Sequence, residues 1–204
     1  TAGEIAQTLD GGYILVGSTA SLDGDIGESL GGSDIWLVRL SASGDLLWEQ
    51  SFGGSDVDSG ERVAVRQDGT FLVGAFTFSM DGDAGDNHGA SDFWLGHISE
   101  DGILLQSRCY GGSRFDHLRD MYFGADGGLV MGGVTNSNDG DVTDNPEEWN
   151  DAWVVYLANG WDITWQTALG GLGDDQVRGL LRTPGDTIFA VASTESQDGD
   201  ITDP

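Results

Sequence analysis

The amino-acid sequence predicts an all-β fold made of tandem four-stranded antiparallel sheets, and three observations lead to this prediction. The tripeptide Asp-Gly-Asp begins at Asp23, Asp81, Asp139 and Asp198, so the same motif returns every 58 or 59 residues. Short apolar runs lie between turns rich in Gly, Asp, Asn and Ser, as β-strands require. No segment shows the roughly 3.6-residue apolar period of an amphipathic helix.

Each repeat carries further elements in phase with Asp-Gly-Asp. The tripeptide ends a Thr-x-Ser-x-Asp-Gly-Asp segment that starts at Thr19, Thr77, Thr135 and Thr194. An Asp-x-Trp segment follows at Asp34, Asp92 and Asp151, and a Gly-Gly pair closes the unit at Gly53, Gly111 and Gly170. Self-similarity at a fixed period indicates one repeated structural unit. We therefore divide the chain into repeats at 1–56, 57–114 and 115–173 and a partial repeat at 174–204.

Each repeat is predicted to form four short strands joined by turns. The first strands are predicted at Glu4–Leu9, Glu61–Arg66, Arg119–Phe123 and Gly179–Arg182. The second strands are predicted at Tyr13–Thr19, Phe71–Thr77, Leu129–Thr135 and Ile188–Thr194. The third strands are predicted at Ile35–Leu40, Phe93–Ile98 and Ala152–Leu157. The fourth strands are predicted at Leu46–Phe52, Ile103–Tyr110 and Ile163–Leu169.

Four antiparallel strands per repeat, stacked against similar units, describe the blades of a β-propeller. The second and third strands are nearly continuous apolar runs, which indicates burial on both faces. A small residue recurs in the second strand, at Gly17, Ala75, Gly133 and Ala192, where a neighbouring sheet needs room. The fourth repeat stops after its second strand, whereas closure takes roughly 4–8 whole blades. We expect part of a longer toroid, or a chain whose open edge receives its missing strands from a partner.

Composition and charge limit the classes of partner. The 204 residues include 35 acids and 8 bases, which gives a formal net charge of −27. This balance argues against nucleic acid, because phosphate contacts need clustered Lys and Arg. No apolar run approaches the roughly 20 residues of a membrane helix, so we expect no membrane insertion. One cysteine, Cys109, excludes an internal disulfide framework.

The repeat resembles a tandem repeat of secreted and surface proteins of the Bacteroidetes group. The matching segments are Gly53-Gly54-Ser55, Thr8–Asp25 and Gly31–Leu40, and the likeness extends over essentially the whole chain. The resemblance implies a propeller or propeller-like module that is often exported by the type IX secretion system. That family usually has Val-Val-Lys-Leu in its third strand, whereas this chain has Val38-Arg39-Leu40 in the first repeat.

The Asp-Gly-Asp loops are the first candidate sites. Two carboxylates separated by one Gly can point into one small loop, and Ca²⁺ takes roughly 6–8 oxygen ligands in proteins. The Asp of Asp-x-Trp ends the same loop and is a third candidate ligand. The alternative is a structural role, in which Asp and Ser cap backbone amides in a tight turn. The candidate calcium ligands are Asp23, Asp25, Asp34, Asp81, Asp83, Asp92, Asp139, Asp141, Asp151, Asp198 and Asp200.

The tryptophans divide into two groups. Trp36, Trp94 and Trp153 recur inside an apolar strand and are expected in the core between sheets. Trp149 and Trp161 break the repeat and lie in or beside loops, which makes them candidate ligand-binding residues. The three histidines do not recur in register and are not expected to form a metal triad.

These observations predict a non-catalytic extracellular or cell-surface scaffold for binding or adhesion, with calcium as a candidate stabiliser. Its partner would be a protein or a glycan on the loop faces, or a second chain at the open sheet edge. One alternative is a self-assembling subunit of a fibre or surface layer. Another alternative is a fragment of a carbohydrate-active enzyme, for which the adjacent carboxylates of Asp174 and Asp175 are the candidate pair. Acids that recur in every repeat favour structure over catalysis.

Overall fold

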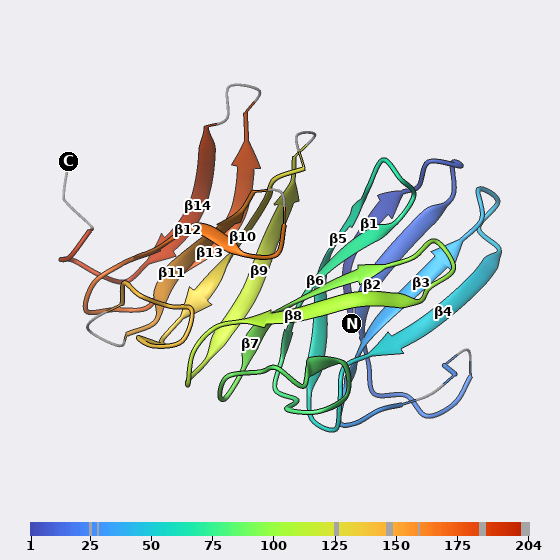
Figure 1. Ribbon diagram of the computed structural model, residues 1–204, viewed down its shortest axis with the longest axis horizontal. Coiled ribbons are helices and arrows are strands. Elements are labelled where there is room, and N and C mark those ends of the chain that lie inside the picture. The colour runs from blue at the N-terminus through green and yellow to red at the C-terminus, as the bar shows by residue number, and fades with distance from the viewer. Residues whose placement is uncertain are drawn as a thin grey trace. The chain divides into compact units, whose positions relative to one another are not determined.

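The computed structural model describes residues 1–24, 26–27, 29–124, 127–145, 149–158, 160–183 and 187–200. These residues form an all-β structure of three four-stranded antiparallel sheets and one two-stranded sheet (Figure 1). Each sheet lies within one predicted repeat. Within the described ranges, the 3₁₀ turn Gly82–Ala84 is the only helical element. No helix among the described residues has the length and hydropathy needed to cross a membrane.

The order of the strands in every sheet follows the order of the chain. The first sheet contains β1 (Ala2–Gln7), β2 (Tyr13–Thr19), β3 (Asp34–Leu40) and β4 (Leu46–Phe52). The second contains β5 (Asp58–Val65), β6 (Phe71–Thr77), β7 (Asp92–Ile98) and β8 (Leu104–Tyr110). The third contains β9 (Asp116–Phe123), β10 (Leu129–Thr135), β11 (Asp151–Leu157) and β12 (Ile163–Leu169). The last contains β13 (Asp175–Arg182) and β14 (Ile188–Thr194).

The structure confirms the all-β prediction and all four second strands at their predicted bounds. The first strands differ, because β5, β9 and β13 begin three or four residues before the predicted starts. The early residues pair with the end of the second strand, as Asp116 does with Thr135. A β-bulge then interrupts the register, which hides the regular alternation that a sequence pattern needs. Closure of the sheets into a propeller stays a prediction.

The chain divides into two compact units, one of residues 1–87 and 93–109 and the other of residues 88–92 and 110–204. The core of the first unit joins Ile35 and Leu37 of β3 to Val63 of β5 and Val73 of β6. The core of the second unit joins Val130 of β10 and Val154 of β11 to Val177 of β13. Each core therefore buries apolar strands between consecutive sheets, which is the main source of stability in such repeats.

A carboxylate also ties the first strands of consecutive sheets together within each unit. In the first unit, the backbone N–H of Val63 donates to Oε2 of Glu4 at 2.9 Å. In the second unit, the backbone N–H of Leu180 donates to Oδ2 of Asp120 at 2.6 Å. Val63 and Leu180 both follow the bulge of their strand. The carboxylates thus satisfy amides near the points where the bulges disturb the ladder.

The recurring tryptophans pack inside the structure, as their place in an apolar strand predicts. Trp94 and Trp153 are fully buried, and their indole N–H groups donate to Asp83 O at 2.9 Å and to Gln166 Oε1 at 2.6 Å. Trp36 is partly exposed and donates to Glu49 Oε2 at 2.9 Å. The indole nitrogen of a buried tryptophan needs such an acceptor, and each repeat supplies one.

Replacing Trp153 by Ala should destabilise the protein by about 3–5 kcal/mol, because the change leaves a large cavity in a close-packed core. Trp149, which is 47% exposed, provides the matched control. Trp149→Ala should cost less than about 1 kcal/mol. Urea unfolding followed by far-ultraviolet circular dichroism measures both. Equal losses in the two variants would contradict the burial described here.

Candidate functional site

The first strand of each later repeat begins with a buried aspartate whose carboxylate accepts hydrogen bonds from two different loops. Its carboxylate accepts a hydrogen bond from the second Gly of the preceding Gly-Gly pair and another from the Ser of its own Thr-x-Ser segment. The backbone bonds are Gly54 N to Asp58 at 2.8 Å, Gly112 N to Asp116 at 2.8 Å and Gly171 N to Asp175 at 3.1 Å. The serine bonds are Ser79 to Asp58 at 2.9 Å, Ser137 to Asp116 at 2.8 Å and Ser196 to Asp175 at 2.5 Å.

Burial and hydrogen bonding oppose each other at these aspartates. Burial raises the pKa of Asp58 and of Asp116 above the usual value, although their hydrogen bonds act in the opposite direction. At Asp175 burial also raises the pKa, but the hydrogen bonds from Ser196 and Thr194 outweigh it, so the net pKa shift is downward. The bonding side chains come from the same repeat as the aspartate, and the bonding amides come from the repeat before it.

The first Asp of Asp-Gly-Asp caps the loop of the preceding repeat. The backbone N–H of Ser55 donates to Asp81 at 2.7 Å, that of Ser113 donates to Asp139 at 2.7 Å, and that of Leu172 donates to Asp198 at 2.9 Å. These amide bonds hold the pKa of Asp81 and of Asp139 below the usual value. One oxygen of each carboxylate is therefore engaged by the backbone, as in the structural alternative for these loops.

The Gly of Asp-Gly-Asp is required by its backbone conformation and by its neighbours. Gly82, Gly140 and Gly199 have φ angles of 59°, 63° and 67°, which is the left-handed region that favours glycine. A Cβ atom at Gly140 would strike the carbonyl oxygen of Gly111. The next residue, Asp141, donates its backbone N–H to the same oxygen at 2.8 Å. The glycine thus lets two loops approach closely enough to share a backbone hydrogen bond.

The Asp of Asp-x-Trp lies at the start of the third strand, and its Oδ1 atom has no hydrogen-bond partner in any of the three described copies. Oδ2 of Asp34 accepts from Leu30 N at 3.0 Å, and Oδ2 of Asp92 accepts from His88 N at 3.0 Å and lies 2.5 Å from His88 Nδ1. In the described part of the chain, Oδ1 of Asp34, Asp92 and Asp151 has no hydrogen-bond partner. Burial, opposed by hydrogen bonds to His88, raises the pKa of Asp92 to about 6. Burial and the nearby Asp175 and Asp200 raise the pKa of Asp151 to about 6.

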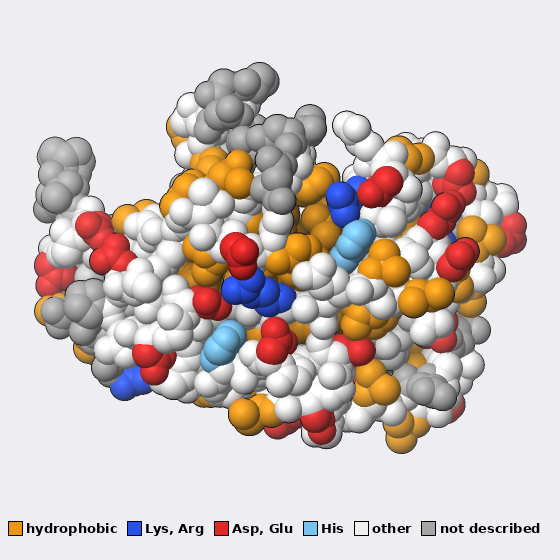
Figure 2. All heavy atoms as spheres, in the orientation of Figure 1, with side chains coloured by type: hydrophobic (Ala, Val, Ile, Leu, Met, Phe, Trp, Pro, Cys, Tyr) orange, Lys and Arg blue, Asp and Glu red, His pale blue; other side chains and the backbone are white. Residues whose placement is uncertain are grey.

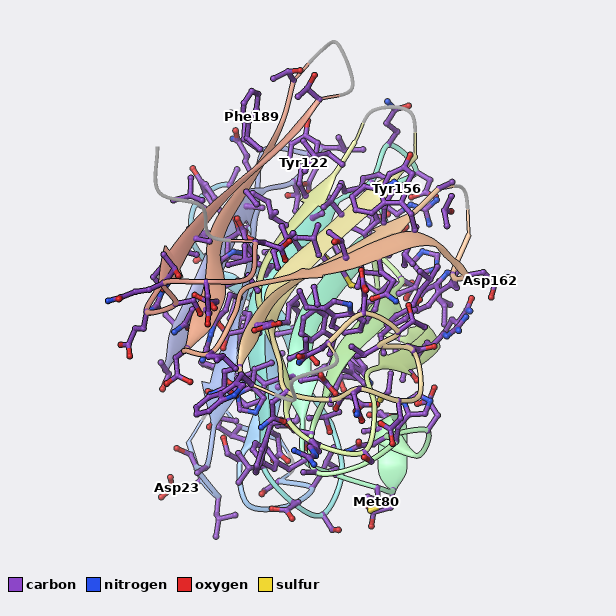
Figure 3. All side chains as sticks on the ribbon, turned by 90° about the vertical axis from the view of Figure 1, so that its left-hand side faces the viewer. Asp23, Met80, Tyr122, Tyr156, Asp162 and Phe189 are labelled. Atoms are coloured by element: carbon purple, nitrogen blue, oxygen red, sulfur yellow. The ribbon has the colours of Figure 1, made fainter. Side chains whose placement is uncertain are left out.

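The structure describes all but one of the candidate calcium ligands. Asp23 is exposed on the loop after β2, which Figure 3 shows at the same end of the first unit as Met80, and Asp25 lies outside the described residues. In the second unit, Asp144, Asp151 and Asp200 line one hollow of 360 Å³. Among the described residues, however, no three His, Cys, Asp or Glu side chains converge as a metal ion requires. Calcium binding by these loops stays a prediction.

The two tryptophans that break the repeat lie at opposite ends of β11. Trp149 precedes this strand and is 47% exposed, whereas Trp161 follows it and is partly buried. The Trp161 carbonyl accepts a hydrogen bond from the Tyr110 hydroxyl at 2.7 Å. A strand of seven residues separates them by roughly 20 Å. They cannot stack on the two faces of one sugar ring, and their role in binding stays a prediction.

A pocket of 460 Å³ in the second unit escaped the sequence reasoning. It is lined by Phe115, His117, Arg119, Val134, Asn136, Asn150, Asp174, Asp175 and Gln176. Phe115, His117 and Arg119 stand where the preceding repeat has Val57, Ser59 and Glu61. The detectable signal was this departure from the repeat, which adds an aromatic ring, an imidazole and a positive charge to one strand. The recurring Asp175 thus shares the lining of this pocket with residues that do not recur, among them Phe115, His117 and Arg119.

Polar groups of the pocket form hydrogen bonds with one another. Phe115 N donates to Asn136 Oδ1 at 3.0 Å, and Asn150 Nδ2 donates to Asp174 Oδ1 at 2.8 Å. Burial and the positive charge of Arg119 lower the pKa of His117 to about 4, so its ring is neutral at pH 7. The rings of Phe115 and His117 meet edge to face with centroids 6.1 Å apart. The pocket therefore combines an aromatic surface with fixed donors and acceptors.

The surface around the recurring sites is acidic but has no single acidic patch in view. Figure 2 shows acidic side chains scattered over the visible face among hydrophobic and uncharged polar ones. Such scatter fits carboxylates that are distributed by the repeat rather than gathered at one ion-binding surface.

Comparison with known proteins gives one distant relative and no family. No protein-family model matches the chain. The chain is similar to the regulatory protein FlaEY of Caulobacter vibrioides, with 28% identity over an alignment of 158 residues that covers 72% of this chain. The matched part is 16% of FlaEY, so the chain spans a small fraction of that relative's length. The similarity indicates distant homology.

The raised pKa of Asp151 predicts that a fall in pH from 7 to 5 increases the free energy of unfolding. The folded state holds a proton more tightly than the unfolded state, whose Asp pKa is near 3.8, so stability rises as the pH falls through 6. Between pH 7 and pH 5 this residue should add about 1 kcal/mol to the free energy of unfolding. Asp151→Asn should lose that gain, while Asp101→Asn in an exposed turn should keep it. Urea unfolding at the two pH values tests this, and an unchanged gain in Asp151→Asn would contradict it.

Proposed function

We propose that this chain is a non-catalytic binding scaffold, in which repeated sheets hold a ligand site formed by residues that differ between repeats. The observation that carries the proposal is the pocket at β9 and β13, with its aromatic ring, amides and single arginine. Its 460 Å³ lies within the range of roughly 300–1,000 Å³ typical of small-ligand sites. We propose extracellular or cell-surface placement on the sequence resemblance alone, with type IX export as the route that the resemblance suggests.

A glycan is the ligand class that the pocket chemistry favours. Phe115 is 47% exposed and presents an apolar surface to the pocket region, as sugar rings need. Asn136, Asn150 and Gln176 supply both donors and acceptors for hydroxyl groups. The lining has one positive charge, Arg119, and two carboxylates, Asp174 and Asp175, which disfavours an anionic ligand. A protein partner on the loop faces is the alternative within the same proposal.

The bonding of the pocket carboxylates supports binding over hydrolysis. A glycosidase needs one carboxyl group free to donate a proton and a second free to act as base or nucleophile. The Asp175 carboxylate is held by Gly171 N and by Ser196, and the Asp174 carboxylate accepts from Asn150. One oxygen of each candidate acid is thus engaged in a structural bond. The relative FlaEY is named for regulation, a role that a binding scaffold would also fill.

Calcium belongs to the proposal as a stabiliser of the acidic loops. The bare Oδ1 atoms of Asp92 and Asp151 are the observation in its favour, and the backbone bonds of Asp81, Asp139 and Asp198 are the observation against a full ligand set. If calcium contributes, excess chelator should lower the melting temperature of protein loaded with calcium, and calcium added back should restore it. An unchanged melting temperature would leave the loops held by hydrogen bonds alone.

The pocket proposal predicts that Phe115 contributes to saccharide binding. Titration of ¹⁵N-labelled protein with maltose, cellobiose and lactose should shift the amide signals of residues 115–119 and 174–176 with at least one sugar. Phe115→Ala should weaken that binding by about five-fold or more, since stacking on an aromatic ring is worth roughly 1 kcal/mol or more. Val57→Ala, at the equivalent exposed position of the preceding repeat, is the matched control and should leave the affinity unchanged.

Two outcomes would overturn the pocket proposal. One is the absence of shifts with these sugars and with a broad glycan array. The other is equal affinity in the wild type and in Phe115→Ala, which would place the glycan elsewhere on the surface.

A further inference from the structure

The hollow of 360 Å³ in the second unit has a lining whose charged and polar side chains end only in oxygen. These side chains are Asp144, Asp151, Thr167 and Asp200, and the remaining lining residues are glycines, an alanine and a leucine. Among the described residues that line it, none is an arginine or a histidine. Hard divalent cations take oxygen ligands in proteins. The hollow therefore offers ligands of the right kind for such an ion and no positive charge of its own.

Asp151 places a buried carboxylate oxygen with no hydrogen-bond partner at the wall of this hollow. The residue is 7% exposed, and its Oδ1 atom has no partner in the part of the chain that the structure describes. Oδ1 lies 2.4 Å from the position that a Cβ atom on Gly170 would take, and Gly170 also lines the hollow. A buried carboxylate oxygen is costly unless a donor or a cation reaches it. This oxygen therefore points to a missing ligand.

More negative charge gathers around the same oxygen. Oδ2 of Asp175 also lies 2.4 Å from the Cβ position of Gly170, so the carboxylates of Asp151 and Asp175 approach one point. The backbone N–H of Asp200 donates to Gly170 O at 2.9 Å, which fixes the Asp200 backbone beside them. Besides burial, the charges of Asp175 and Asp200 raise the pKa of Asp151. Within the described ranges, none of these three aspartates forms an ion pair.

The second repeat has a histidine and an arginine at positions where the third repeat has neither. Nδ1 of His88 lies 2.5 Å from Oδ2 of Asp92, the Asp-x-Trp aspartate of the second repeat. Four residues before the corresponding aspartate, the third repeat has Glu147 in its sequence. The second repeat also has Arg108 where the third repeat has Thr167. The third repeat thus keeps the carboxylates without the bases, and a cation from solution would balance their charge.

We propose that the hollow beside Asp151 binds one divalent cation that keeps part of its hydration shell. Asp151 Oδ1 is the direct protein ligand, and Asp175 and Asp200 add negative charge. No three described acids converge as direct ligands, so water completes the coordination. The hollow of 360 Å³ leaves room for this water, since one water molecule takes roughly 30 Å³ in the liquid. Calcium and magnesium share this chemistry and are distinguished by the test.

This inference rests on the calcium part of the proposed function and assigns it to one place in the third repeat. It does not depend on glycan binding at the pocket of β9 and β13. The two can therefore fail separately.

Calorimetric titration of the whole chain, freed of metal with a chelator, tests the inference with calcium and with magnesium in separate experiments. The buffer contains potassium chloride at about 0.15 M, where the screening length is about 8 Å, to suppress the general attraction of a chain of charge −27 for cations. At least one of the two ions should bind. In ¹⁵N-labelled protein the same ion should shift the amide signals of residues 151, 167–171 and 199–200.

Four variants locate the ion. Asp151→Asn keeps the shape, removes the charge and should weaken binding by about ten-fold or more. Asp162→Asn removes one exposed acid at the other end of β12 and should leave the affinity unchanged. Thr167→Arg puts a positive charge into the hollow and should weaken binding by about ten-fold or more. Thr167→Gln, which introduces the residue that the first repeat has as Gln50, should keep most of the affinity.

Circular dichroism checks that each variant folds. Thr167 is only half-buried, so the comparison of Thr167→Arg with Thr167→Gln decides the matter even if Asp151→Asn fails to fold.

Two results would overturn the inference. One is equal affinity for the ion in the wild type and in the folded variants Asp151→Asn and Thr167→Arg, which would place the ion in another acidic loop and leave the calcium part of the proposed function standing. The other is the absence of binding of either ion to the whole chain, which would remove calcium from the proposed function as well.

Discussion

A buried carboxylate at the start of each first strand is the constraint on which the repeat depends. Asp58, Asp116 and Asp175 are buried, and an unpaired buried charge would cost several kcal/mol. Each is tolerated because a glycine amide of the preceding loop and a serine hydroxyl of its own repeat donate to it. Removal of any donor would leave the charge short of a partner. The aspartate therefore fixes where one repeat ends and the next begins.

The rest of the motif follows from this bond. The Gly-Gly pair lacks side chains because the loop lies against carboxylates, and a Cβ at Gly112 would meet Asp139 and Ser137 of the next strand connection. The Asp-Gly-Asp turn then returns a carboxylate and a backbone amide to the same loop. Most of the recurring acids thus have a structural partner, which explains how a chain with a net charge of −27 folds with so few bases.

Much of the fold was predictable from the sequence, because period and apolar runs report burial directly. Tyr13–Thr19 and Leu129–Thr135 were predicted to the residue, since both strands are apolar along their length. The starts of β5, β9 and β13 were missed, because a polar aspartate opens each strand and a bulge follows. The pocket was missed for a different reason. Phe115 and Arg119 depart from the repeat in the sequence, but they form a pocket only because β13 brings Gln176 and Asp174 beside them.

The proposed binding scaffold rests on the buried aspartate at the start of each first strand. A double-mutant cycle between Asp116 and Ser137 tests that premise most directly. We predict a favourable coupling free energy of about 1–3 kcal/mol from the unfolding of Asp116→Ala, Ser137→Ala and the double variant. A coupling below about 0.5 kcal/mol would contradict the claim that the serine hydroxyl of its own repeat holds this buried carboxylate.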